Sequence, residues 1–296
     1  MNYILFDPPN VTRFYPFTLT RPLGEMRLFG GTVRDYWERY LGAKVSYLTH
    51  SHLSSLYPTK WDSSNNVLIC SDSMPKDNGT ILNIGAEIMS LKQIQKEWTL
   101  KSPGYKPDFH SNNDFLNNQM SFWKDTVSNV DISSNVLFND EDGPIIIEEN
   151  VTIMEGAMIR GPVHICSGSV IKMGAKIYGP TVIGPYCKVG GEVSDSIFLG
   201  YANKSHDGFL GHSIVGEWCN IGAGTSSSNL KNDYSTIKMW NYDKQQFIDS
   251  KQQYLGLYMG DHSKSAINTS FNTGTTIGVN CNIFGAGFPR NFIPSF

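Results

Sequence analysis

Residues 147–189 read IEENVTIMEGAMIRGPVHICSGSVIKMGAKIYGPTVIGPYCKV and carry a β-branched aliphatic residue at every sixth position. The members of this first series are Ile147, Ile153, Ile159, Ile165, Ile171, Ile177, Ile183 and Val189. A second series of mostly small residues runs four positions behind it: Val151, Ala157, Val163, Ser169, Ala175, Thr181 and Cys187. An amphipathic helix has a period of about 3.6 and an exposed strand a period of about 2, so neither explains this spacing.

A period of six is typical of a solenoid in which each hexad forms one short strand and one corner. Three hexads then complete a triangular coil, with the β-branched residues inside and the small residues where the chain turns. The backbone groups of each coil pair with the coils on either side, so only the two ends of the stack are open sheet edges. The stretch therefore predicts a parallel β-helix.

The period is interrupted twice further along the chain. After Val189 it is lost through EVSDSIFLGYANKSHDGFLG (192–211), which we interpret as an excursion from the coil, and it resumes at Val215 and Ile221. An aromatic and polar insertion is expected at about residues 230–258. The period then returns at Met259, Ser265, Phe271, Ile277 and Ile283.

The chain ahead of the repeat has a different character. Residues 1–105 show short strand patterns and one modest helix, which predicts a small, truncated α/β domain. Residues 106–142 are polar and predict a linker, with a short helix around 115–127. The β-helix is expected over residues 143–296, which makes the predicted fold class mainly β. The last residues, FGAGFPRNFIPSF, offer no polar cap for a solenoid, which is compatible with a longer native chain.

Composition and charge limit the classes of binding partner and the cellular compartment that are expected. The net charge is −3 and the basic residues are scattered, so no face is expected to bind nucleic acid. Five cysteines without a CxxC pair argue against a disulfide framework and a zinc site, and favour a cytoplasmic protein. Cys187, Cys219 and Cys281 fall on the small-residue position and are interpreted as structural. Neither a signal peptide nor a membrane span is apparent, so no membrane partner is expected.

The run NKSHDGFLGHSIVGEWCNIGAGTSSSNLKN (203–232) carries a family resemblance. It resembles the acetyltransferase domain of bifunctional N-acetylglucosamine-1-phosphate uridylyltransferase and related sugar-1-phosphate nucleotidyltransferases with a hexapeptide-repeat tail. The matching features are a lysine-containing loop ending in His206, then Phe209, the NIGAGT motif at 220–225, and Asn229. The resemblance implies a left-handed coil, a homotrimer with sites between subunits, and acetyl-CoA as a co-substrate.

The same resemblance implies roles for individual residues. His206 would be the general base that removes a proton from a sugar amine as it attacks the thioester, and Glu192 is the candidate carboxylate that tunes it. A neutral imidazole suits this task because its ordinary pKa lies close to neutral pH. The alternative is that His206 is a polar corner residue without a chemical role.

Further residues are implied to bind the two substrates. Asn220 and Asn229 would contact the sugar, although asparagine ladders between coils are an alternative for Asn220. Lys188 and Lys204 would meet a phosphate as point charges, although a solvated corner lysine is the alternative for Lys204. Phe209 stands where the family has a tyrosine. The residues implied to contact the acyl carrier are Gly222, Ala223 and Val279.

The amino-terminal region resembles the opening of sugar nucleotidyltransferases through Thr20, Arg21 and Pro22. Those enzymes need a glycine-rich turn, a lysine soon after the proline, and Mg²⁺, which would be required here only if nucleotidyl transfer occurs. DPPN stands in place of the glycines, and proline removes amide donors. Arg21 is a candidate phosphate ligand, with a helix-capping or salt-bridging role as the alternative.

Three functions stay open at this point. The first is acyl transfer from a coenzyme A thioester to the amine of a hexosamine phosphate or nucleotide amino sugar. The second is nucleotidyl transfer to a sugar-1-phosphate. The third is a noncatalytic scaffold that binds a sugar nucleotide.

Overall fold

The computed structural model describes the chain except for residues 74, 76–80, 86–88 and 96–128. The chain forms two compact units. The first contains residues 1–14 and 18–119, and the second contains residues 15–17 and 120–296. The predicted helix at 115–127 lies outside the described residues. Within the described part of the chain, no helix has the length and apolar character needed to span a bilayer.

The first unit is built on a four-stranded sheet with the order β4-β1-β5-β6. Strand β1 (Asn2–Phe6) pairs in parallel with β4 (Val45–Leu48) and β5 (Asn66–Cys70), and β6 (Ile81–Gly85) is antiparallel to β5. Ile4 and Phe6 pack on one face of the sheet, whereas Leu5 packs on the other. The short elements between β1 and α1 are η1 (Val11–Phe14), η2 (Phe17–Leu19), η3 (Leu23–Glu25), β2 (Arg27–Leu28) and β3 (Gly31–Thr32).

Helix α1 (Val33–Leu41) covers the second face of this sheet with Val33 and Trp37. It begins at a capping box, in which Thr32 and Asp35 each accept the other's backbone N–H. It ends at Gly42, whose φ of 63° is left-handed and therefore suits glycine. This unit has the small α/β character that the sequence predicts.

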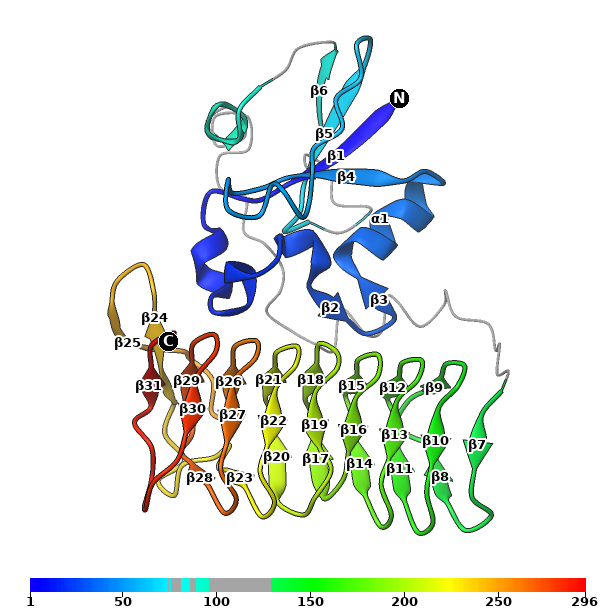
Figure 1. Cartoon of the computed structure of the whole chain (residues 1–296), viewed down its shortest axis with the longest axis vertical. Helices are drawn as coiled ribbons and strands as arrows, with labels where there is room; N and C mark the ends of the chain where they lie inside the picture. Colours follow the sequence, from blue (N-terminus) through cyan, green and yellow to red (C-terminus); the bar gives the residue numbers. More distant parts are fainter. Residues whose placement is uncertain (74, 76–80, 86–88, 96–128) are drawn as a thin grey trace. The chain divides into compact units, whose positions relative to one another are not determined.

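The second unit is a parallel β-helix with three faces (Figure 1). The first face, sheet C, contains β7 (Asp131–Ile132), β10 (Thr152–Ile153), β13 (Val170–Ile171), β16 (Lys188–Val189), β19 (Asn203–Lys204), β22 (Asn220–Ile221), β27 (Lys264–Ser265) and β30 (Asn282–Ile283). The second face, sheet D, contains β8 (Leu137–Asn139), β11 (Met158–Arg160), β14 (Lys176–Tyr178), β17 (Glu192–Ser194) and β20 (Phe209–Gly211), with the pair β23 (Ser226–Ser227) and β28 (Ser270–Phe271) further along the chain.

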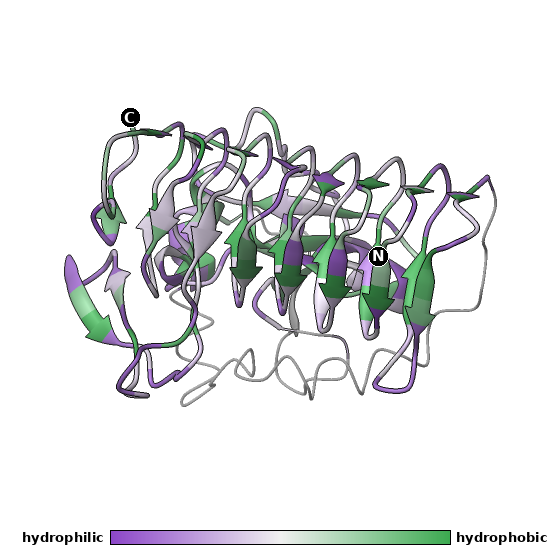
Figure 2. Ribbon diagram, turned by 90° about the horizontal axis from the view of Figure 1, so that it is seen from below, coloured by the Kyte–Doolittle hydropathy of each residue, from purple (hydrophilic) through white to green (hydrophobic). Residues whose placement is uncertain are grey.

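The third face, sheet E, contains β9 (Ile145–Ile147), β12 (Val163–Ile165), β15 (Thr181–Ile183), β18 (Ile197–Phe198), β21 (Ile214–Val215), β26 (Tyr258–Met259), β29 (Thr276–Ile277) and β31 (Phe292–Ile293). Figure 2 shows strands of successive coils lying side by side along the stack. The predicted fold class is confirmed.

Both residue series point into the coil as expected. Every member of the second series is fully buried, and in the first series only Ile147, in the first coil, is partly exposed. Met259, Phe271 and Ile277 continue the same core after the insertion. The five cysteines are free and buried, and burial raises the pKa of the Cys219 thiol to about 12. The cysteines that fall on the small-residue position are therefore packing residues, as predicted.

The predicted excursion at 192–211 is wrong. The chain stays in the coil through β17, β18, β19 and β20, and Val189 pairs directly with Lys204. The interior positions here are held by Val193, Phe198 and Leu210, which are buried. Shorter corners, not a departure of the chain, shift the phase of the repeat.

The start of the β-helix and the insertion also differ in detail from the prediction. Strands β7 and β8 pair with β10 and β11, so the coil begins inside the predicted linker and not at residue 143. The insertion is a hairpin of β24 (Lys238–Asn241) and β25 (Gln246–Asp249), closed at its base by a bridge between Leu230 and Tyr254.

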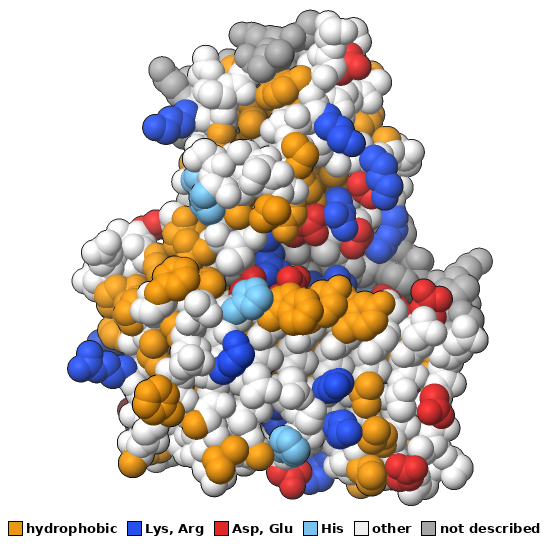
Figure 3. Space-filling view, viewed as in Figure 1, with side chains coloured by type: hydrophobic (Ala, Val, Ile, Leu, Met, Phe, Trp, Pro, Cys, Tyr) orange, Lys and Arg blue, Asp and Glu red, His pale blue; other side chains and the backbone are white. Residues whose placement is uncertain are grey.

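One row of corners carries stacked rings. Tyr186, Tyr201 and Trp218 lie in successive coils with ring centroids 5.4 and 4.5 Å apart, and His262 continues the stack beyond Trp218. All four have left-handed backbone angles. Figure 3 shows hydrophobic side chains gathered along the loops that follow β15, β18 and β21. The rings cover each other's faces, which indicates a ladder that stabilises the corners.

Candidate functional site

Two corners at opposite ends of strand β20 each carry a histidine. His206 lies in the corner that leads from β19 into β20. His212 lies in the corner that leads from β20 into β21. The two imidazoles of one chain are therefore separated by the length of a strand.

His206 is exposed to solvent, as a group that exchanges protons with a substrate must be. Its backbone carbonyl accepts a hydrogen bond from Lys204. Among the interactions of the described residues, no hydrogen bond or ion pair engages its imidazole. The role implied by the resemblance stays a prediction.

Glu192 is half-buried on β17 and accepts a hydrogen bond of 2.8 Å from the Tyr178 hydroxyl. No hydrogen bond or ion pair among the described residues joins it to His206. Within one chain Glu192 therefore orients Tyr178, and any effect on His206 stays a prediction.

The expected role of Lys204 as a phosphate-binding point charge is wrong for this chain. Lys204 is an interior residue, 2% exposed, and its Nζ donates to the carbonyls of Gly190 and His206 at 3.0 and 2.9 Å. Burial lowers the pKa of its ammonium group to about 8. The strand alternation turns this side chain inward, so it ties two corners together from inside the coil.

A polar row crosses the outer face of sheet C. In register, Lys188 pairs with Asn203, Asn203 with Asn220, and Asn220 with Lys264. The Asn203 side chain donates to the Asn220 side chain at 2.9 Å, so the ladder anticipated for Asn220 is present. Both lysines are exposed. The row therefore offers two cations and two amides on one flat face, which suits an anionic, hydroxyl-rich ligand.

A second cluster of side chains surrounds His212. The register pair of Ser194 with Gly211 places Asp195 beside His212 in the neighbouring coil, with the carboxylate 4.0 Å from Nδ1. Asn229 Nδ2 lies 3.0 Å from the same Nδ1. The Tyr254 ring stacks on the imidazole with a centroid distance of 5.1 Å.

The insertion contributes two residues to the cluster around His212. Asn229 and Tyr254 stand at its two roots, where the Leu255 N–H donates to the Asn229 carbonyl. A Cβ at Gly211 would meet the rim of the Phe209 ring at 2.5 Å and Asn229 Nδ2 at 2.7 Å, so Phe209 and Asn229 flank the same backbone. Of the predicted residues, the structure thus brings Phe209 and Asn229 together.

His212 and Asp195 were not identified from the sequence. The second histidine, six residues after His206, was the available signal. Burial lowers the pKa of His212, although Asp195 opposes that shift, and burial raises the pKa of Asp195. Burial therefore favours the neutral imidazole, and the Asp195 carboxylate opposes that preference.

The three residues predicted to contact the acyl carrier do not share one corner. Gly222 and Ala223 lie in the corner after β22, where a Cβ at Gly222 would meet the Ala266 backbone at 2.4 Å. Val279 lies in the corner after β29 and is 8% exposed beneath contacts with Ser295 and Phe296. One chain alone therefore does not assemble these three residues into a groove.

In the first unit, a carboxylate occupies the turn where nucleotidyltransferases need amide donors. Asp7 follows β1 and accepts hydrogen bonds from the Leu23 N–H at 2.9 Å and the Thr49 hydroxyl at 2.5 Å. Asp72, at the end of β5, is ion-paired with Arg13 at 3.2 Å. Arg21 is buried, 4% exposed, as expected of a structural arginine. These contacts take up donors and charges that a triphosphate would need.

One group of described side chains could hold a metal ion. Glu148, His164 and Cys166 have ligand atoms within 4.8 Å of one another. Glu148 Oε1 lies 2.8 Å from His164 Nε2, and the same carboxylate accepts from the N–H and hydroxyl of Ser167. Hydrogen bonds already explain this arrangement.

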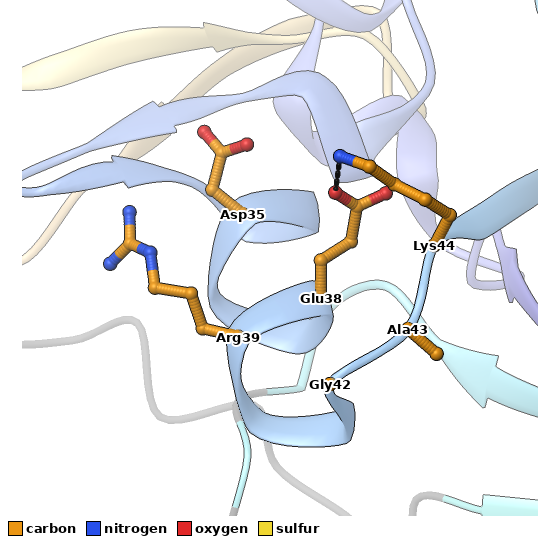
Figure 4. A pocket seen from close by; sticks show the side chains of 6 residues that line it. All are labelled: Asp35, Glu38, Arg39, Gly42, Ala43 and Lys44. Atoms are coloured by element: carbon orange, nitrogen blue, oxygen red, sulfur yellow. Dashed lines mark hydrogen bonds and ion pairs between the residues drawn. The ribbon is translucent and has the colours of Figure 1, made fainter.

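A hollow of about 380 Å³ lies at the carboxyl end of α1. Figure 4 shows the residues that line it, with Lys44 paired to Glu38 at 2.6 Å. Arg39 donates to the Gly30 carbonyl, and Asp35 serves the helix cap. The charged groups are engaged in holding the helix end, so the hollow does not resemble a reaction site.

Comparison with known proteins supports both halves of the architecture. The family model for sugar nucleotidyl transferases matches residues 3–103, and the model for six bacterial transferase hexapeptide repeats matches residues 144–179. A bifunctional sugar-1-phosphate nucleotidylyltransferase/acetyltransferase from Sulfurisphaera tokodaii is 33% identical over 144 residues, which cover 48% of this chain and 35% of that protein.

Two archaeal proteins named bifunctional protein GlmU extend the match. The Methanococcus aeolicus protein is 31% identical over 198 residues, covering 64% of this chain and 47% of the relative. The Methanococcus vannielii protein is 30% identical over 222 residues, covering 74% of this chain and 52% of the relative. The chain thus spans about half or less of the length of these relatives. The resemblance drawn from the sequence is confirmed for both regions.

Proposed function

We propose that this chain, which joins a sugar nucleotidyl transferase region to a hexapeptide-repeat transferase region, transfers an acetyl group from acetyl-CoA to the amine of a hexosamine-1-phosphate or related nucleotide sugar. The observation that carries the proposal is the motif at 203–232 folded onto a β-helix, with an exposed His206 near the polar row of sheet C.

The polar row supplies the expected substrate chemistry. Lys188 and Lys264 provide positive charge for a phosphate, and Asn203 and Asn220 provide donors and acceptors for hydroxyl groups. These side chains sit on short, rigid strands, which favours a fixed sugar position. Lys264 takes the place of Lys204 as the second cation.

His206 is proposed as the general base. Its neutral imidazole would accept a proton from the attacking amine, and the departing thiolate would then receive that proton. The acyl carrier would lie against Gly222 and Ala223, where the small side chains leave the backbone accessible. A homotrimer would bring corners of neighbouring chains together.

Nucleotidyl transfer is the second candidate, favoured by the family match over residues 3–103. It would require Mg²⁺ and a triphosphate at the carboxyl ends of β1 and β5. The engagement of Asp7 with Leu23 and Thr49, and of Asp72 with Arg13, argues against turnover there.

Two assays on the whole protein separate these functions. Acetyl-CoA and glucosamine-1-phosphate should release free thiol, whereas nucleoside triphosphate, Mg²⁺ and a sugar-1-phosphate should release little pyrophosphate. His206→Ala should lower thiol release by about 100-fold or more without changing the fold. An unchanged rate in this variant would remove His206 from the chemistry, and pyrophosphate without thiol would reverse the assignment.

A further inference from the structure

Acyl transfer to an amine needs two proton acceptors. An amino sugar near neutral pH carries an ammonium group, which has no lone pair with which to attack a thioester. When ammonium and acetyl thioester become amide and thiol, the nitrogen loses two protons. One ends on the thiol sulfur, and the other leaves to solvent.

We infer that His212 accepts the first of these protons and thereby converts the bound ammonium group into the attacking amine. This inference rests on the proposed acyl transfer and adds a second catalytic residue to it. The amine then forms its bond to the carbonyl carbon, the C–S bond breaks, and His206 of a neighbouring chain passes the second proton to the sulfur, because the two histidines of one chain lie at opposite ends of β20. The His212 imidazolium returns its proton to water.

The contacts of His212 match this role. Its side chain is 31% exposed, and Asp195 and Asn229 both lie beside its Nδ1. In the structure the Asn229 amide presents Nδ2 to His212 Nδ1 at 3.0 Å. The proposed role requires the amide oxygen at that position, so that Nδ1 carries the proton beside the Asp195 carboxylate. Nε2 is then the basic nitrogen, oriented as in other base and carboxylate pairs.

The surroundings also suit a cation. Asp195, with its carboxylate 4.0 Å from Nδ1, lies close enough to stabilise the imidazolium. Tyr254 covers one face of the imidazole and reduces its contact with water. The titratable groups that face His212 are thus Asp195 and, across its ring, Tyr254. His206 has no comparable support within the described chain.

The test compares thiol release at pH 6.5 and pH 9 in wild type and His212→Asn, since asparagine tolerates the left-handed backbone at this position (φ 50°). At pH 6.5 the variant should be slower by about 100-fold, because it must wait for neutral amine from solution. At pH 9 the amine is already neutral, so the two rates should agree within about threefold.

His262→Asn is the matched control, because His262 also has a left-handed backbone (φ 59°) at a corner and stacks on an aromatic ring. It should behave as wild type at both pH values. A His212→Asn rate equal to wild type at pH 6.5, or a loss of equal size at both pH values, would overturn the inference.

A measurement without turnover separates this inference from the proposed function. Imidazole NMR titration should show a lower pKa for His212 in Asp195→Asn than in wild type, because the carboxylate raises it. Glucosamine-1-phosphate should shift the His212 signal, and N-acetylglucosamine-1-phosphate should shift it less. No thiol release by wild type refutes the acyl transfer, whereas thiol release with an unshifted His212 signal refutes only the inference.

Discussion

Lys204 occupies an interior position of the coil. The equivalent position in the adjacent coil is held by Val189. An aliphatic residue would satisfy the pattern there, so the sequence predicted a solvent-facing lysine in a loop. The strand register turned it inward instead. Burial disfavours its charged form, and hydrogen bonds to two corner carbonyls only partly compensate.

The pH dependence of stability should reveal this buried charge. The pKa of Lys204 is about 8 in the folded chain and 10.5 when unperturbed. Between those values the unfolded state binds more protons, so the contribution of Lys204 to stability rises with pH. Relative to Lys204→Met, wild type should gain up to about 3 kcal/mol in the free energy of unfolding from pH 7.5 to pH 10.5.

Denaturant unfolding at the two pH values measures the difference in free energy of unfolding between wild type and Lys204→Met. Lys188→Met serves as the control, because Lys188 lies on the same face of the β-helix with an exposed side chain. The difference in free energy of unfolding between Lys188→Met and wild type should stay constant with pH. A gap between wild type and Lys204→Met that does not change with pH would mean that the lysine is hydrated in the folded chain.

Elements of the β-helix were predictable where the period holds. The two residue series identified the buried positions from 147 to 189 because every hexad repeats the same strand and corner. Corners are less constrained than strands, since only strand register must be kept for the coils to pair. The shortened corners between Val189 and Leu210 therefore hid the coil, and with it the pairing of Asp195 with His212.

Truncation of one isoleucine side chain to alanine should distinguish a buried position from an exposed one. Ile171 on β13 is fully buried, so Ile171→Ala should lower the free energy of unfolding by about 2–5 kcal/mol through lost burial and a cavity. Ile267→Ala, at a side chain 69% exposed, should change it by less than about 0.5 kcal/mol. Thermal or denaturant unfolding of both variants provides the measurement, and equal effects would place Ile171 outside the core.

At the scale of the whole molecule, the separation of the two histidines becomes decisive. His206 and His212 lie at opposite ends of β20, so one chain cannot readily present both to one amine. The sequence suggested a shared site through the family resemblance, but spacing alone could not show which residues face the same corner. If both imidazoles serve one reaction, neighbouring chains must supply them.

Subunit complementation tests this arrangement in the proposed trimer. His206→Ala and His212→Asn should each be nearly inactive at pH 6.5 when assembled alone. After dissociation and joint reassembly in equal amounts, about one quarter of the sites would combine an intact His206 with an intact His212 from the adjacent chain, so about one quarter of wild-type activity should return. Reassembly of His206→Ala with a chain carrying both substitutions is the control and should restore nothing, because no chain then supplies His206. If the two single variants also fail to recover activity together while their mass shows mixed trimers, the two histidines do not meet across a subunit boundary.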